Sequence, residues 1–146
     1  MNANRAHLIF AILSAAVFLT ASCSKGERAD AIEKQLKDKI RDGVSIGAGR
    51  AEVESFVDSL DIESRKFTRG GYKNDVSSSE LAFRAKQEAP DSKKTIPSEI
   101  KGFFAASMRK VDSDYRYLFT IDMALEFYFD ENERLVDYVV YQIRHP

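Results

Sequence analysis

The side chains that most often perform chemistry are few in this chain of 146 residues, and they do not cluster. Cys23 is the single cysteine, so no disulfide can form within one chain. His145 stands at the penultimate position, where we expect a solvated tail residue rather than a general base. The acidic runs at 112–114 and 130–133 lack the ligand spacing and central glycine of a calcium loop, and the serines at 77–79 lack the glycines of a hydrolase elbow. These patterns favour a protein that is not an enzyme and has no cofactor or metal.

The charge and composition narrow the class further. Lysine and arginine number 22 against 23 aspartates and glutamates, a balance that argues against a nucleic-acid partner, which selects a clearly basic surface. With 44% hydrophobic and 31% charged residues, the chain has the composition of an ordinary globular protein. We therefore expect one folded domain, which we place at residues 29–146.

The first 22 residues have the three parts of a secretory signal peptide. Residues 1–7 contain one arginine and no acid, residues 8–20 are apolar except for Ser14 and Thr20, and Ala21 and Ser22 are small. The apolar run ends before the roughly 20 residues that a membrane-spanning helix needs. The alternative is an uncleaved membrane anchor.

Residues 19–23, Leu-Thr-Ala-Ser-Cys, end the apolar run at the only cysteine. This segment resembles the lipobox of bacterial lipoproteins, although Thr20 stands where the pattern usually has leucine. The resemblance implies that Cys23 becomes the N-terminus and carries a diacylglycerol, with residues 23–28 as a short lipid-anchored tether. Ser24 after the cysteine is associated in such proteins with sorting to the outer membrane. The alternative is a cysteine that stands by chance beside an ordinary cleavage site.

Two helices are expected near the start of the domain. Residues 29–42 place Ile32, Leu36 and Ile40 four positions apart, and Gly43 follows where a left-handed cap would end the helix. Residues 50–60 carry the apolar face of a second helix, after a turn that contains Gly47 and Gly49.

The rest of the chain reads mainly as strands. Residues 117–129 carry large apolar side chains at every second position, and residues 135–144 return after the turn residues 130–134, which predicts a hairpin. Residues 100–111 are a further strand candidate, although the segment 103–106 also fits a buried helix. Residues 81–86 alternate like a half-buried strand.

The segments in between read as one short strand and two loops. Residues 62–68 fit a short strand, whereas residues 69–79 and 88–98 have the composition of loops. The predicted fold is α+β, with two N-terminal helices packed on an antiparallel β-meander of three or four strands.

A strip on the outward face of the long hairpin is the candidate for partner recognition. Asp122 and Glu126 alternate with the apolar positions, and Arg144 is a candidate for a cross-strand position. Surface ion pairing is one interpretation. The other is a protein-binding strip that also includes Tyr128 and Tyr138, because tyrosine and arginine are enriched at interfaces.

Two segments carry a second resemblance: residues 46–57, a glycine turn leading into a helix, and residues 127–136, a terminal hairpin. They resemble the small outer-membrane lipoproteins of the SmpA/OmlA (BamE-like) group and the related β-lactamase-inhibitor-protein-like modules. This chain has Ser59-Leu60-Asp61 where the group closes its second helix with a glycine and a proline, and Asn132-Glu133 where the group has a hairpin glycine. The resemblance implies a lipid-anchored scaffold that binds proteins, and no residue role is carried over.

We therefore expect a non-enzymatic envelope protein that faces the periplasm, is held in the outer membrane by lipid on Cys23, and binds another envelope protein. The alternative is a periplasmic inhibitor or immunity-type protein that binds one specific enzyme or toxin.

Overall fold

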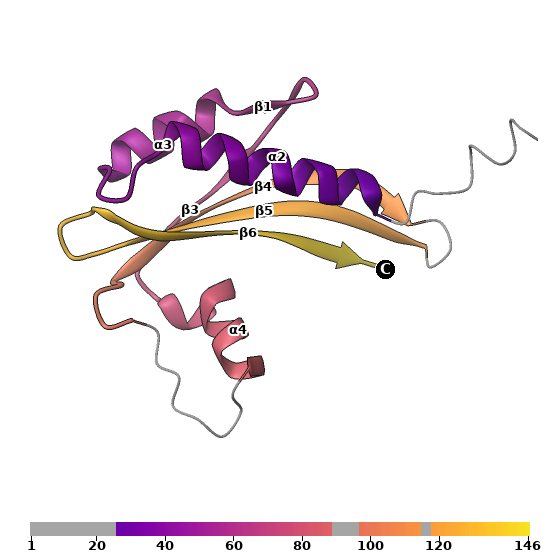
Figure 1. Cartoon of the computed structure of the whole chain (residues 1–146). Helices are drawn as coiled ribbons and strands as arrows, with labels where there is room; N and C mark the ends of the chain where they lie inside the picture. The colour runs from indigo at the N-terminus through magenta and orange to yellow at the C-terminus, as the bar shows by residue number, and fades with distance from the viewer. Residues whose placement is uncertain (1–25, 89–96, 115–117) are drawn as a thin grey trace, which may run out of the picture.

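The fold is α+β and is built around one four-stranded antiparallel sheet. The computed structural model describes residues 26–88, 97–114 and 118–146. The sheet has the order β3-β4-β5-β6, and Figure 1 shows α2 and α3 on one of its faces and α4 on the other. The elements are α2 (Glu27–Gly43), α3 (Arg50–Ser59), β1 (Asp61–Ile62), β2 (Arg65–Lys66), β3 (Thr68–Lys73), a 3-10 turn (Val76–Ser78), α4 (Glu80–Glu88), β4 (Gly102–Asp114), β5 (Phe119–Phe129) and β6 (Leu135–His145).

The two N-terminal helices form where the apolar spacing predicts them, and each buries one stripe. Ala29, Ile32, Leu36 and Ile40 of α2 are buried, as are Val53 and Val57 of α3. The expected role of Gly43 is wrong. Gly43 is the last residue of α2 and has no positive φ, and a Cβ there would overlap the ring of Phe56. The glycine therefore lets α2 approach α3 closely.

Strands β4, β5 and β6 form a continuous antiparallel meander. Phe104 pairs with Phe127, and Phe127 pairs with Tyr138, so these three side chains share one face. The strand reading of residues 100–111 is confirmed against the alternative of a buried helix. The terminal hairpin is also confirmed, while Tyr117, the expected start of its first strand, lies outside the described residues.

The segment after α3 differs from the prediction. Residues 62–68 were expected to be one strand, but β1 and β2 form a small hairpin whose turn residues Glu63 and Ser64 have φ of 51° and 63°. This left-handed pair matches the turn that joins two strands through two residues. Residues 69–79 were expected to be a loop, yet they contain most of β3, which pairs with β4.

The largest error concerns residues 81–86, which form the middle of helix α4 rather than a strand. Ser79 marks the start of this helix, because its hydroxyl accepts a hydrogen bond from the N–H of Ala82 at 3.3 Å. Ala82 is buried, whereas Phe83 is 55% exposed. Six alternating residues fit both periods, and Ser79 followed by Glu80 is the helix signal that the alternation does not include.

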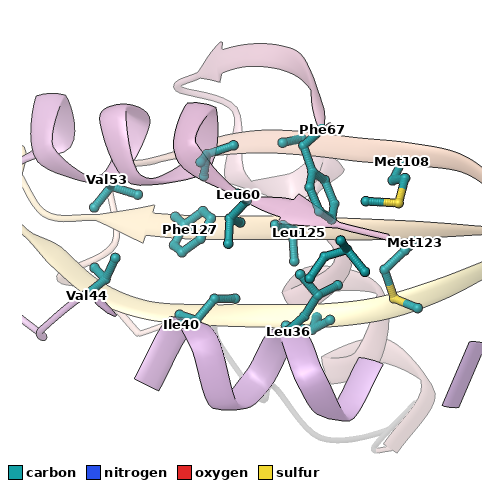
Figure 2. Packing of buried hydrophobic residues seen from close by; sticks show 14 of the residues in the cluster. Leu36, Ile40, Val44, Val53, Leu60, Phe67, Met108, Met123, Leu125 and Phe127 are labelled. Carbon is teal, nitrogen blue, oxygen red and sulfur yellow. The ribbon is translucent and has the colours of Figure 1, made fainter. Parts of the chain in front are cut away.

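The main core lies between the sheet and the pair α2 and α3. Figure 2 shows Leu36 and Ile40 of α2, Val53 of α3, and Leu125 and Phe127 of β5 pointing into this layer. A smaller cluster on the opposite face joins buried Ile100, Phe103 and Tyr128 to half-buried side chains that include Leu81 of α4. The sheet is therefore covered on both faces.

The turn between α2 and α3 is held by the terminal hairpin. The N–H of Gly47 donates to the carbonyl of Leu135 at 2.8 Å, and the N–H of Leu135 donates to the carbonyl of Ala48 at 2.9 Å. Gly49 forms a β-bridge with Arg134. These bonds join the first and last parts of the domain.

Candidate protein-binding edge

The predicted recognition strip is divided between the two faces of the sheet. Asp122, Glu126 and Tyr128 lie on the α4 face and are at most 7% exposed, so the prediction that they point to solvent is wrong. Tyr138 packs against the main core on the opposite face, and Arg144 is exposed and pairs with Ile121 rather than with either acid. The five residues do not form one surface.

Glu126 holds the start of α4 on the sheet. Its carboxylate accepts hydrogen bonds from the N–H of Glu80 at 2.8 Å, from the hydroxyl of Tyr141 at 3.1 Å, and from the hydroxyl of Tyr128. The Tyr128 hydroxyl in turn accepts from the N–H of Leu81 at 3.1 Å. A negative charge at a helix N-terminus is favourable because the first N–H groups lack partners within the helix. Burial, followed by the Glu126 carboxylate, raises the pKa of both tyrosines well above the ordinary value.

Asp122 stabilises an irregularity in β4. The register between β4 and β5 shifts between Met108 and Asp112, and Lys110 at this bulge has a φ of 52°. The carboxylate of Asp122 accepts from the N–H of Lys110 at 2.7 Å, and its other oxygen lies 3.2 Å from Nε2 of His145. His145 is the last residue of β6 and contacts this buried acid, while its own side chain is 49% exposed, in keeping with the expected solvated position. Both acids have structural partners that account for their burial.

The two edges of the sheet differ in how accessible they are to a further strand. The edge strand β3 has six residues, a bulge between Arg69 and Gly71, and an Arg69 side chain that is tied to Glu54 and Asp58 of α3. The other edge, β6, has eleven residues, pairs only with β5 in the described ranges, and is regular from Asp137 to His145 after an irregularity at Val136. Short bulged edges resist strand addition and long regular edges permit it. The β6 edge is therefore the one that can accept another chain.

The backbone of β6 presents hydrogen-bonding groups away from the sheet. The N–H of Tyr138 donates to the carboxylate of Asp137 at 2.7 Å, so this group faces the free edge rather than β5. Because alternate residues of an antiparallel edge strand bond in opposite directions, the N–H and C=O of Val140 also face outward. Asp137 is exposed and shields one of these positions.

A groove of about 410 Å³ runs along this edge, and we call it the β6 groove. Its lining consists of Lys37 and Arg41 of α2, Arg84 of α4, and residues Asp137, Tyr138, Val139 and Val140 of β6. The lining therefore carries three cations and one carboxylate. The sequence-based strip included only Tyr138 from this set. Sequence alone does not indicate the three cations, because Lys37 and Arg41 lie on the polar side of a helix whose signal is its apolar stripe, and Arg84 lies in a segment that alternates like a strand.

A larger hollow of about 570 Å³ lies between α2 and α3, and it is a weaker candidate. Two lysines and two aspartates, Lys34, Lys39, Asp38 and Asp42, contribute to its lining, so its charges balance. It lies between helices, whose backbone groups are bonded within each helix. The β6 groove has an excess of positive charge among the side chains that line it, and it also has free backbone groups.

Two other features, a metal-binding cluster and a membrane-spanning helix, are absent from the part of the chain that the structure describes. The described residues contain no group of three or more His, Cys, Asp or Glu side chains that could hold a metal ion. None of the helices in those ranges has the length and apolar character that a membrane span requires. The signal peptide, residues 23–25 of the expected tether and most of the expected loop at 88–98 lie outside the described residues, while Glu27 and Arg28 of that tether belong to α2.

Comparison with protein-family models, with curated proteins and with solved structures finds no match to this chain.

Proposed function

We propose that this chain is a non-enzymatic lipoprotein of the bacterial cell envelope, anchored through Cys23, that binds another envelope protein. The free edge of β6 in its groove is the observation that supports the binding function. The signal peptide and the lipobox resemblance support the location, in the outer membrane and facing the periplasm. The scaffold would share with the SmpA/OmlA group two N-terminal helices on an antiparallel meander.

An open strand edge favours a protein partner over a small molecule. Strand addition gives affinity through main-chain hydrogen bonds, and flanking side chains give selectivity. The lining of the β6 groove supplies both kinds of contact. Tyr138 and Val140 offer backbone groups, and α2 and α4 contribute side chains from the two faces of the sheet. An edge of this length would be an aggregation hazard in a protein that did not use or protect it.

The anchor is tested by the intact mass of protein extracted from membranes. We expect the mass of residues 23–146 plus acyl groups, and we expect Cys23→Ser to yield an uncleaved precursor or a protein in the soluble fraction. Unmodified chain that starts near Ser24, or normal processing and membrane association of Cys23→Ser, would contradict the anchor.

The binding function is tested by placing a photo-cross-linking amino acid at one position at a time in living cells. We expect a discrete envelope-protein adduct from position 137, which lies on the β6 edge. Position 35 is the matched control, because Gln35 lies on α2 but lines the hollow toward α3. Equal cross-linking at both positions, or none at 137, would argue against an interface on β6.

A further inference from the structure

Helix α2 runs along the β6 edge in the opposite direction to the strand. Near the start of α2, the side chain of Gln142 donates to Asp30 at 2.7 Å and to Glu33 at 3.0 Å. Further along, Lys37 and Arg41 line the groove beside residues 137–140 of β6. The cations of α2 therefore lie along the free edge of β6.

These cations are available to a ligand. The side chains of Lys37, Arg41 and Arg84 are 53%, 65% and 45% exposed. Each already pairs with an acid on its own helix, for example Lys37 with Glu33 at 2.6 Å and Arg84 with Glu80 at 2.7 Å. Exposed pairs of this kind contribute little to stability because solvent screens them, so an incoming carboxylate can replace them.

The spacing of the cations matches an extended chain. Lys37 and Arg41 are four residues apart, which is about 6 Å along a helix axis. Residues i and i+2 of a strand lie on one face about 6.6 to 6.8 Å apart. An added strand could therefore direct residues i and i+2 toward Lys37 and Arg41, and the residue between them toward Arg84 on the α4 side.

We propose that the β6 groove binds an extended acidic segment of a partner protein, which adds to the sheet as a fifth strand beside β6. This inference rests on the proposed protein-binding function and assigns the chemistry of the partner. Backbone hydrogen bonds form along Tyr138 and Val140, and two or three consecutive acidic side chains meet the cations of α2 and α4. Asp137 gives up its bond to the N–H of Tyr138 when the segment binds.

A second copy of this chain is a poorer occupant of the same groove. Antiparallel pairing of two β6 strands about a two-fold axis would place the two α2 helices side by side on one sheet face. Lys37 and Arg41 of both copies would then face each other. Such like-charge contacts are unfavourable, whereas an acidic segment is attracted.

The test uses the full-length protein in detergent and fluorescence anisotropy of three labelled seven-residue peptides. The first has three consecutive glutamates between valines and threonines, the second has lysines in place of the glutamates, and the third is the glutamate peptide with alternate backbone amides N-methylated. We expect only the first to bind, and its affinity should fall at least about tenfold between low salt and about 0.5 M salt. Equal binding of the N-methylated peptide would show charge attraction without strand addition and would overturn the proposal.

Charge reversal on α2 locates the site. We expect Lys37→Glu combined with Arg41→Glu to weaken binding of the glutamate peptide by at least about tenfold. Lys34→Glu combined with Lys39→Glu makes the same change in net charge on the α3 side of the helix and should leave the affinity within about twofold. Equal losses in the two double variants, or no binding of the glutamate peptide at all, would refute the acidic-strand inference. An envelope-protein adduct from position 137 would then still support the binding function.

Discussion

Glu126→Gln removes one negative charge from the α4 face of the sheet and keeps the size of the side chain. The carboxylate accepts from three donors, the N–H of Glu80 and the hydroxyls of Tyr128 and Tyr141. The amide of glutamine offers one oxygen and places an NH₂ group where the other oxygen was. At least one donor therefore loses its acceptor in a site that is only 5% exposed.

The expected loss follows from these contacts. A buried donor without an acceptor costs about 1 to 3 kcal/mol. Loss of the charge at the start of α4 adds about 0.3 to 1 kcal/mol. We therefore expect Glu126→Gln to lower the free energy of unfolding by about 1 to 4 kcal/mol, and to do so without creating a cavity.

Urea unfolding followed by circular dichroism measures the loss in free energy of unfolding, and hydrogen exchange shows which part of the fold is destabilised. Exchange should accelerate at the amides of Glu80 and Leu81 in α4 more than at those of α2. Glu131→Gln, at an exposed carboxylate of the terminal hairpin, is the control and should change stability by less than about 0.5 kcal/mol. A Glu126→Gln protein as stable as the parent, or with equal acceleration in both helices, would refute the role of the carboxylate.

Three further outcomes are expected from urea titrations. Unfolded tyrosines ionise near their ordinary pKa of 10.0, whereas burial and the neighbouring carboxylate raise the pKa of Tyr128 and Tyr141 in the folded state. The contribution of these two tyrosines to stability is therefore constant below pH 10.0 and falls above it by about 1.4 kcal/mol per pH unit for each tyrosine. Replacing both with phenylalanine should remove that part of the slope, and an unchanged slope would contradict the assignment. Gly102→Ala should cost about 1 to 3 kcal/mol because its Cβ would lie 2.8 Å from a backbone oxygen of β3, while Gly49→Ala, with its nearest neighbour at 3.9 Å, should be nearly neutral; similar effects would argue against close packing at the first site. Asp122→Ala should cost about 1 to 3 kcal/mol and Asp122→Asn less, because asparagine keeps an acceptor for the bulge; equal losses would show that the charge matters more than the hydrogen bond.

Long periodic segments are the part of this fold that can be predicted from the sequence, because many residues in each segment follow the same period. Leu36 and Ile40 belong to a stripe that runs the length of α2, and β5 alternates over its whole length. Helix α4 was missed because it has nine residues and its one exposed aromatic side chain, Phe83, obscures the helical period. Short elements depend on tertiary packing more than on their own pattern.

The second face of the sheet could not be predicted from alternation alone. Polar residues at every other position of an antiparallel strand usually face water, which is why Asp122 and Glu126 were placed outside. They are buried because a bulge and a helix N-terminus supply their hydrogen-bond donors, which lie on other elements, 12 and 46 residues away in the chain. The free edge of β6 could not be predicted either, because strand order in a sheet is a property of the whole fold.

The bonds between the α2–α3 turn and the terminal hairpin also determine when the domain can fold. Leu36 and Val53 belong to one core cluster with Leu125 and Phe127, so the two N-terminal helices obtain part of their core from strands that are made much later. Contacts between such distant segments form late, because a long loop must close before they are gained. A nascent chain, which is made from its N-terminus onward, would lack a complete core until β5 and β6 have been made. If the chain is exported as we propose, this order of synthesis would keep the polypeptide unfolded while its N-terminal part is already crossing the membrane.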